Sequence, residues 1–437
     1  MKKFRNLLVI LFLTSISFAN EIDSLLDILA EKNIITYGEA QILKTETKEQ
    51  IKTLNAQGKN ELLPKWIQNL SFKGDLRLRL QSDQKPNTNT AARNRARIRF
   101  RLGAETRMED NLKAGFGLAT TSLKSGSSSV SVSVSTKTGK GSITVPSSTV
   151  ADGEPRSTNF TLGDSLSKMP IAVDYAYVEY DPADFIKVLG GKFKNPIWNA
   201  TDLLWDSDLN PDGLALVMKL KPSENISLFF TPEVMIIDEI SSSEKDPLMY
   251  AFQPGLDIKW QSFSLKSAVA YYIFSGVKGN KLDHSAGTNT RASTALSNNY
   301  TSVNPSVSIS KSELPLIKTV SVFGDYVINT DSSTNNTGYS IGLQIGNSKI
   351  SDLGQWSLKS MYRQLETDSW LDTFPDSDAY GGKTNCQGRE MIFELGLSKN
   401  SLLSFDYYSM DKLVGNSSKT PNGTVLEVMQ LDFVYKF

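Results

Sequence analysis

The sequence predicts an all-β protein: a transmembrane antiparallel β-barrel of about 16 strands, preceded by a short N-terminal helical periplasmic segment. Three observations support this fold class. Apolar and polar residues alternate with a period of two after residue 70, as in strands with two different faces. The links between these segments are alternately short and long, which is typical of outer-membrane barrels. The start of the chain also has the features of a secretion signal.

The first segment, 1–19, is predicted to be a signal peptide. Lys2, Lys3 and Arg5 precede an apolar run over 7–18, and Ser17-Phe18-Ala19 fits a cleavage site before Asn20. The apolar run is too short to cross a bilayer as a helix. Removal of the signal peptide takes away three of the 47 basic residues. The remaining 44 basic residues and the 47 acidic residues give the mature chain a net charge of about −3. This balance indicates no nucleic-acid partner.

The numbers of histidine and cysteine argue against an enzyme. The chain has one histidine, His284, in a polar stretch between strands, and one cysteine, Cys386. A Ser-His-Asp site and most zinc sites are therefore unlikely in this sequence. We predict no catalytic residue, no metal and no cofactor.

The second segment, 20–64, is predicted to be a helical periplasmic module. Ile22, Leu25, Leu26 and Leu29 have helical spacing, and Thr36-Tyr-Gly-Glu39 fits a capping box that opens a second helix. The alternative is an unstructured leader that docks on the mouth of the barrel.

The remaining residues, 65–437, are predicted to form the barrel. The strand candidates are 70–81, 93–107, 112–121, 171–180, 185–193, 213–221, 226–236, 250–260, 263–274, 302–310, 319–329, 338–346, 355–366, 388–397, 402–410 and 425–437. Short links such as 109–110, 181–184 and 399–400 share the side of the N-terminal module. Long links such as 122–170, 194–212 and 367–387 share the other side. The Ser/Thr-rich link 122–170 either adds a hairpin or stays unstructured.

Aromatic residues near strand ends predict interfacial belts. Trp260 and Trp356 lie beside short links, and a second group lies near the opposite strand ends: Tyr271, Tyr272, Phe274, Tyr407 and Tyr408. The last strand alternates in the same way and stops on Phe437. A soluble protein would expose this apolar edge, whereas a closed barrel pairs it.

Seven arginines define the arginine ladder, the main candidate for function. The second strand reads Arg93-Asn-Arg-Ala-Arg-Ile-Arg-Phe-Arg101, and the first strand adds two more arginines on one face. An arginine facing lipid at mid-bilayer costs about 2–4 kcal/mol, so the ladder is expected to line the lumen. The alternative is that interior carboxylates neutralise these arginines, which then brace the wall. The ladder comprises Arg77, Arg79, Arg93, Arg95, Arg97, Arg99 and Arg101.

The long link 194–212 combines apolar residues with carboxylates. Because an exposed loop of this kind would leave an apolar patch in water, we expect it to fold into the lumen and face the ladder. The alternatives are a cap over the mouth or a contact with a neighbouring subunit. Its candidate constriction residues are Trp198, Asp202, Trp205, Asp206, Asp208 and Asp212.

Several of these segments together resemble the putative porin family of bacterial outer membranes. The resemblance covers most of the chain. The segments that carry it are Leu25-Leu-Asp-Ile-Leu29, Ile34-Ile-Thr-Tyr-Gly-Glu-Ala40, Gly74-Asp-Leu-Arg-Leu-Arg79, Asn94–Gly103, Asp202-Leu-Leu-Trp-Asp-Ser-Asp208 with Pro211 and Gly213, and Gln355–Arg363 with Asp376-Ser-Asp378.

The resemblance implies a water-filled porin for passive diffusion of small hydrophilic solutes and ions across the outer membrane. It implies a homotrimer, contact with outer-membrane lipid and lipopolysaccharide, and a terminal Phe437 that the barrel assembly machinery reads. The link 122–170 looks like an insertion. The alternatives that the residues leave open are a barrel-anchored surface adhesin or receptor with a blocked lumen, and a barrel enzyme.

Overall fold

The structure is a computed structural model. It describes residues 36–39, 41, 43, 45, 65–86, 88–122, 127–136, 139–148, 153–163, 165–166, 168–241, 245–315, 317–413 and 425–437. The predicted signal peptide and most of the predicted helical module lie outside these residues. The chain divides into two compact units, Met1–Leu70 and Ser71–Phe437.

The first unit contains the predicted capping box. The backbone N–H of Thr36 donates to Glu39 Oε2 at 2.8 Å, and the Glu39 N–H donates to Thr36 Oγ1 at 3.2 Å. A helical turn follows, and the short helix α4 (Lys65–Gln68) ends the unit. No helix in the described part of the chain is long and apolar enough to span a membrane.

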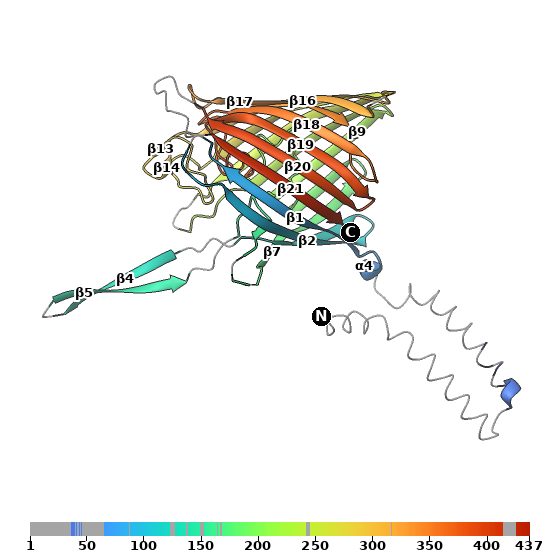
Figure 1. Ribbon diagram of the computed structural model, residues 1–437, viewed down its shortest axis with the longest axis horizontal. Coiled ribbons are helices and arrows are strands. Elements are labelled where there is room, and N and C mark those ends of the chain that lie inside the picture. The colour runs from blue at the N-terminus through green and yellow to red at the C-terminus, as the bar shows by residue number, and fades with distance from the viewer. Residues whose placement is uncertain are drawn as a thin grey trace. The chain divides into compact units, whose positions relative to one another are not determined.

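The second unit is a barrel of sixteen strands (Figure 1). All sixteen predicted strands are present, with ends that differ from the prediction by at most three residues. The first eight are β1 (Ser71–Gln84), β2 (Arg93–Glu109), β3 (Leu112–Thr120), β7 (Ile171–Ala183), β8 (Ile186–Lys192), β9 (Asp212–Ser223), β10 (Ile226–Ile236) and β11 (Leu248–Trp260). The others are β12 (Phe263–Ser275), β15 (Tyr300–Ser312), β16 (Thr319–Asn329), β17 (Thr337–Gly346), β18 (Trp356–Leu365), β19 (Cys386–Ser398), β20 (Ser401–Lys412) and β21 (Leu426–Lys436).

Antiparallel pairing runs around the whole ring and closes it. β1 pairs with β2 on one side and with the last strand, β21, on the other. The backbone of Phe437 exchanges two hydrogen bonds with Gly74, which extends this seam to the end of the chain. Closure pairs the first strand with the last, so these two strands do not present free edges to the bilayer.

Short and long links alternate around the barrel, as predicted. One pair departs from the rule, because the link 347–355 on the short side is longer than 330–336 on the long side. The insertion between β3 and β7 contains a hairpin, β4 (Ser127–Thr136) with β5 (Gly139–Ser148). Of the two alternatives predicted for the link 122–170, the added hairpin is therefore the correct one. Farther along it, β6 (Phe160–Thr161) pairs with β2. The link after β12 contains a small hairpin of β13 (Arg291–Ala292) and β14 (Ala295–Leu296).

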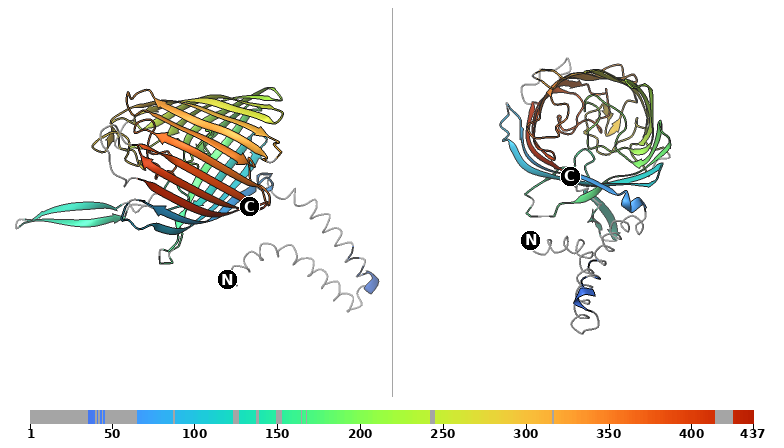
Figure 2. Two further views of the ribbon diagram at one scale, coloured as in Figure 1. Left: turned by 45° about the horizontal axis from the view of Figure 1, so that its top comes forward. Right: turned by 90° about the vertical axis from the view of Figure 1, so that its right-hand side faces the viewer.

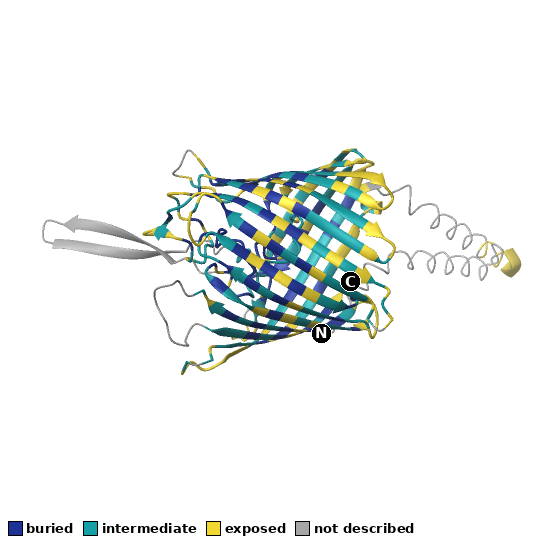
Figure 3. Cartoon of the chain, turned by 90° about the horizontal axis from the view of Figure 1, so that it is seen from above, coloured by how far each residue is buried: buried dark blue, intermediate teal, exposed yellow. Residues whose placement is uncertain are grey.

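Exposed and buried residues alternate along the strands (Figure 3). On β1 the side chain of Leu80 is 61% exposed and that of Arg79 is 3% exposed, so the apolar face is the outer one. Outward aromatic residues lie near both ends of the strands, as in interfacial belts: Tyr180, Trp260, Phe263 and Tyr435 at the short links, and Tyr250, Tyr271, Tyr326 and Tyr339 at the long links.

Three residues assigned to the belt by the sequence prediction instead face inward. Tyr272, Phe274 and Tyr408 are almost fully buried inside the barrel. The prediction was wrong because adjacent residues of a strand point to opposite faces, so Tyr271 and Tyr272 cannot both meet lipid.

The main apolar core lies inside the barrel at its long-link end. Loops enter the ring of strands there, as the view on the right of Figure 2 shows. Their apolar residues pack with inward residues of the wall. Trp205 lies 4.8 Å from Phe374 between ring centroids, and Trp370 lies 4.8 Å from Tyr272. Trp370 has no exposed surface. Burying a large apolar side chain contributes about 1.5–3 kcal/mol, so this core holds the loops inside.

Candidate functional site

The arginine ladder faces the lumen, the space enclosed by the barrel. The register of β1 and β2 places Arg77 opposite Arg99 and Arg79 opposite Arg97. The alternation of the strand aims these arginines inward, since their neighbours Leu78 and Leu80 lie on the exposed outer surface.

Interior carboxylates compensate most of the ladder. Arg79 makes a two-pronged contact with Asp432, with both distances 2.7 Å, and its third nitrogen lies 2.9 Å from Asp378. Five of the seven arginines have a carboxylate partner. The pairs are Arg77–Asp432, Arg79–Asp432, Arg79–Asp378, Arg95–Asp83, Arg99–Asp75, Arg101–Asp75 and Arg101–Asp208. Seven arginines against these five aspartates leave a local excess of two positive charges.

That excess corresponds to Arg97 and Arg93. Arg97 contacts neutral groups, the side chains of Gln81 and Ser157 and the carbonyl of Asn159. Within the described residues it has no carboxylate at ion-pair distance. Arg93 is exposed at the long-link end of β2. Part of the ladder therefore braces the wall, and Arg97 keeps an uncompensated charge inside the lumen.

The loop between β8 and β9, residues 193–211, folds into the lumen. Its partners lie on strands around the whole ring, a pattern that only an inward fold allows. Gln253 on β11 exchanges hydrogen bonds with the backbone of Trp198, and Asp325 on β16 accepts from the N–H groups of Ala200 and Thr201. Trp205 Nε1 lies 3.4 Å from the hydroxyl of Tyr272 on β12.

The loop carboxylates make specific contacts. Asp202 lies 2.5 Å from Arg363 on β18. Asp208 accepts from Thr158 and lies 3.3 Å from Arg101, so it joins the loop to the ladder. Asp212 is the first residue of β9, outside the loop, and pairs with Lys192 at 2.7 Å. The predicted constriction residue Trp198 is half-buried, with Lys266 Nζ 4.6 Å from its ring centre.

Asp206 and Asp208 have opposite environments. Burial and the neighbouring Asp208 raise the pKa of Asp206 to about 7. Burial alone would raise the pKa of Asp208 as well, but Arg99 and Arg101 lower it below its ordinary value. The buried loop therefore carries one carboxyl that titrates near neutral pH.

A second inward loop, 366–385, was not predicted as part of the site. The N–H of Asp206 donates to the carbonyl of Phe374, and the N–H of Ser377 donates to Asp206 Oδ2 at 2.8 Å. The available signal was a repeated pattern, because tryptophan and Asp-Ser-Asp occur together in both loops, at Asp206–Asp208 and Asp376–Asp378. A third link, 276–299, binds this loop through backbone N–H groups that donate to Asp372.

The closed sixteen-strand barrel, with an apolar outer face and a polar, charged wall inside, defines a channel-type protein of the bacterial outer membrane. The chain belongs to the family described as "Putative porin", whose model matches residues 82–146, 140–310 and 317–437. It is an outer-membrane porin, and the match does not favour a surface adhesin. Family and fold point to a channel rather than an enzyme.

Solved porin structures are similar at low identity. The high-pH structure of Pseudomonas putida OprB is 9% identical with a TM-score of 0.50, covering 85% of this chain and 95% of that one. A triple mutant of Rhodopseudomonas blastica porin is 10% identical with a TM-score of 0.42, covering 84% and 100%. Salmonella typhi OmpF in complex with daunomycin is 12% identical with a TM-score of 0.45, covering 84% and 97%. No curated protein sequence matches the chain.

Proposed function

We propose that small hydrophilic solutes and ions diffuse passively through the lumen, past the arginine ladder and loop 193–211, with no chemical step. The contact between Asp208 and Arg101 carries this proposal, because it places the acidic loop directly against the basic wall. An ion that passes beside this contact meets acidic charge from the loop and basic charge from the wall, which together give a transverse field. The uncompensated Arg97 is then the residue with most influence on ion preference.

Single-channel recording of the refolded protein in a planar bilayer tests this proposal. We expect discrete, long-lived open steps on the order of 0.1 to 1 nS in molar salt, below the scale of an empty sixteen-strand lumen because three loops enter it. Bilayers that stay silent, although the inserted barrel is folded by its heat-dependent gel mobility, would contradict a conducting lumen.

We further propose that the porin assembles as a homotrimer. The support is the family membership, since a sixteen-strand porin with a large apolar outer face can bury part of that face between subunits. Conductance steps in groups of three, together with a trimer mass in light scattering corrected for detergent, are the expected results. A monomer mass with single steps would refute the trimer.

A further inference from the structure

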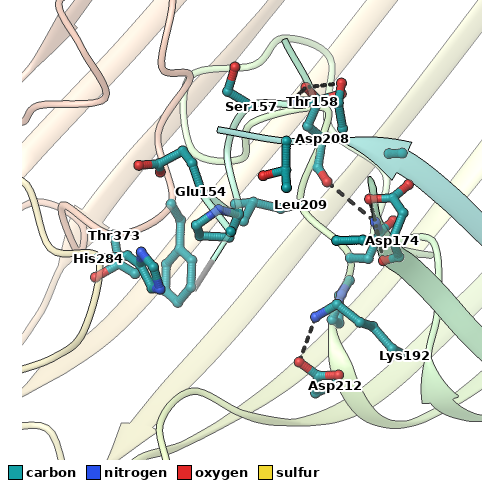
Figure 4. A pocket seen from close by; sticks show the side chains of 18 of the residues that line it. Glu154, Ser157, Thr158, Asp174, Lys192, Asp208, Leu209, Asp212, His284 and Thr373 are labelled. Atoms are coloured by element: carbon teal, nitrogen blue, oxygen red, sulfur yellow. Dashed lines mark hydrogen bonds and ion pairs between the residues drawn. The ribbon is translucent and has the colours of Figure 1, made fainter. Parts of the chain in front are cut away.

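A pocket of about 400 Å³ lies at the long-link end of the barrel, beside the inward loops (Figure 4). The ends of β3, β7, β8, β9 and β10 form its outer wall. Described residues of the links 121–170, 193–211, 237–247, 276–299 and 366–385 complete it. This volume is in the range of small-molecule sites. No ladder residue lines the pocket, although Asp208, which does, pairs with Arg101 of the ladder.

Six carboxylates line the pocket against one lysine, and four of them have a cationic partner. The four pairs are Glu154–Arg156, Asp174–Lys194, Asp208–Arg101 and Asp212–Lys192. The other two, Asp238 and Asp283, have no cation at ion-pair distance within the described residues. They are adjacent, because the backbone N–H of Asp283 donates to Asp238 Oδ2 at 3.0 Å. The pocket therefore has two uncompensated negative charges.

Buried polar atoms without partners provide a second, independent observation. The side chains of Asn210 and Thr121 line the pocket and are 8% and 6% exposed. The amide nitrogen of Asn210 is fully used by Asp174 and Asp208, but its oxygen Oδ1 has no hydrogen-bond partner, and neither has Thr121 Oγ1. Such atoms are costly unless a bound molecule satisfies them. A free amide oxygen calls for an N–H or O–H donor.

Part of the remaining lining is apolar. Trp205 and Phe374 present aromatic surface to the pocket, with their ring centres 4.8 Å apart. Aromatic surface favours the hydrocarbon part of a ligand and also attracts cations.

We propose that this pocket binds a small organic cation, an ammonium or guanidinium group on an apolar body, as an outer recognition site for solutes that enter the channel. The cation meets Asp238 and Asp283, and the body lies against Trp205 and Phe374. Asn210 Oδ1 is buried, so a rotation of its side chain exposes it to the N–H groups of the ligand. This inference rests on the proposed function, since it names the class of solute that the porin recognises.

Isothermal titration of the refolded full chain with phenethylammonium tests the site. We expect saturable binding that weakens as salt rises from 50 to 500 mM, and no comparable binding of the neutral analogue 2-phenylethanol. The double variant Asp238→Asn/Asp283→Asn should weaken binding by roughly three- to thirtyfold, the scale of two partly exposed charge pairs. Asp331→Asn, an exposed carboxylate on another loop, is the matched control and should bind like the wild type.

Three results would overturn the proposal: no saturable binding to the wild type, equal binding of 2-phenylethanol, or undiminished binding to the double variant. If the double variant misfolds, the salt dependence of binding to the wild type still tests whether the site recognises the charge of the ligand. Conductance of the same preparations separates the two proposals. Binding without conductance rejects the channel and keeps the cation site, whereas conductance without binding rejects the cation site alone.

Discussion

At the scale of single residues, Arg97 differs from the rest of the ladder because its partners are neutral. Replacing it by glutamine removes a charge without leaving a carboxylate unpaired. A unit charge about 5 Å from the ion path interacts by about 0.8 kcal/mol in a water-like medium, repelling cations and attracting anions. Its removal changes each permeability by up to about fourfold in opposite directions, so the cation-to-anion permeability ratio should rise by up to about sixteenfold. Reversal potentials in a tenfold salt gradient measure this ratio.

Lys349→Gln is the control for this experiment. Lys349 is exposed on the link 347–355, outside the lumen wall, so its replacement should leave the ratio unchanged. Equal reversal potentials for Arg97→Gln and the wild type would show that Arg97 does not influence the conducting path.

Arg79 illustrates the bracing part of the ladder. Arg79→Gln leaves the buried Asp432 and the half-buried Asp378 with weaker compensation, although Arg77 still lies 3.5 Å from Asp432. Breaking a buried ion pair costs about 3–5 kcal/mol, and we expect the lower end of this range in the free energy of unfolding. Urea unfolding in detergent measures it. Lys192→Gln, which breaks an exposed pair with Asp212, should cost less than about 1 kcal/mol. Similar losses for the two variants would contradict this account.

At the scale of elements, the two Trp-containing loops hold each other inside the barrel. Trp370 contacts Trp205, Tyr272 and Phe274, and its Nε1 donates to the carbonyl of Leu204. Trp370→Ala should destabilise the loops by about 3–5 kcal/mol and increase mean conductance and current noise as they leave the lumen. Trp260→Ala removes an outward tryptophan and should leave conductance unchanged. If Trp370→Ala showed wild-type conductance and no additional current noise, the loops would stay in place without this core.

Loop stability should also depend on pH through Asp206. Its pKa is raised from 3.8 to about 7, so the folded loop binds this proton more tightly than the unfolded chain does. The stabilisation is complete below about pH 4 and is lost as pH rises through about 7. We expect more open-channel noise at pH 8 than at pH 6, and Asp206→Asn should remove the difference. An unchanged pH dependence in Asp206→Asn would assign the effect to another group.

At the scale of the whole molecule, the division into two units predicts that the barrel is independent of the N-terminal segment. The ring closes through β1 and β21, and both strands belong to Ser71–Phe437. Deletion of residues 22–60 should therefore leave a heat-resistant barrel that conducts like the full chain, as judged by gel mobility and bilayer recording. A deleted protein that cannot refold would show that the segment is needed for assembly.

The barrel and the direction in which its charges face follow from the local pattern of the sequence. Strand alternation has a period of two residues, so Arg77, Arg79 and their neighbours on β2 had to share one face, and lipid excludes charge from the other. The inward fold of loop 193–211 was predictable for a different reason. Its apolar residues Leu203, Leu204 and Trp205 would be costly to expose to water.

Which charges cancel and which segments meet depends on the three-dimensional fold. The partners of the ladder, Asp75, Asp378 and Asp432, lie far apart along the chain and converge through barrel closure and inward loops. Contacts between distant segments also place loop 366–385 inside the barrel and bring Asp238 and Asp283 together in one pocket. The local sequence pattern determines which face of a strand a residue occupies. The partners of that residue depend on contacts between distant segments, and the local pattern does not contain this information.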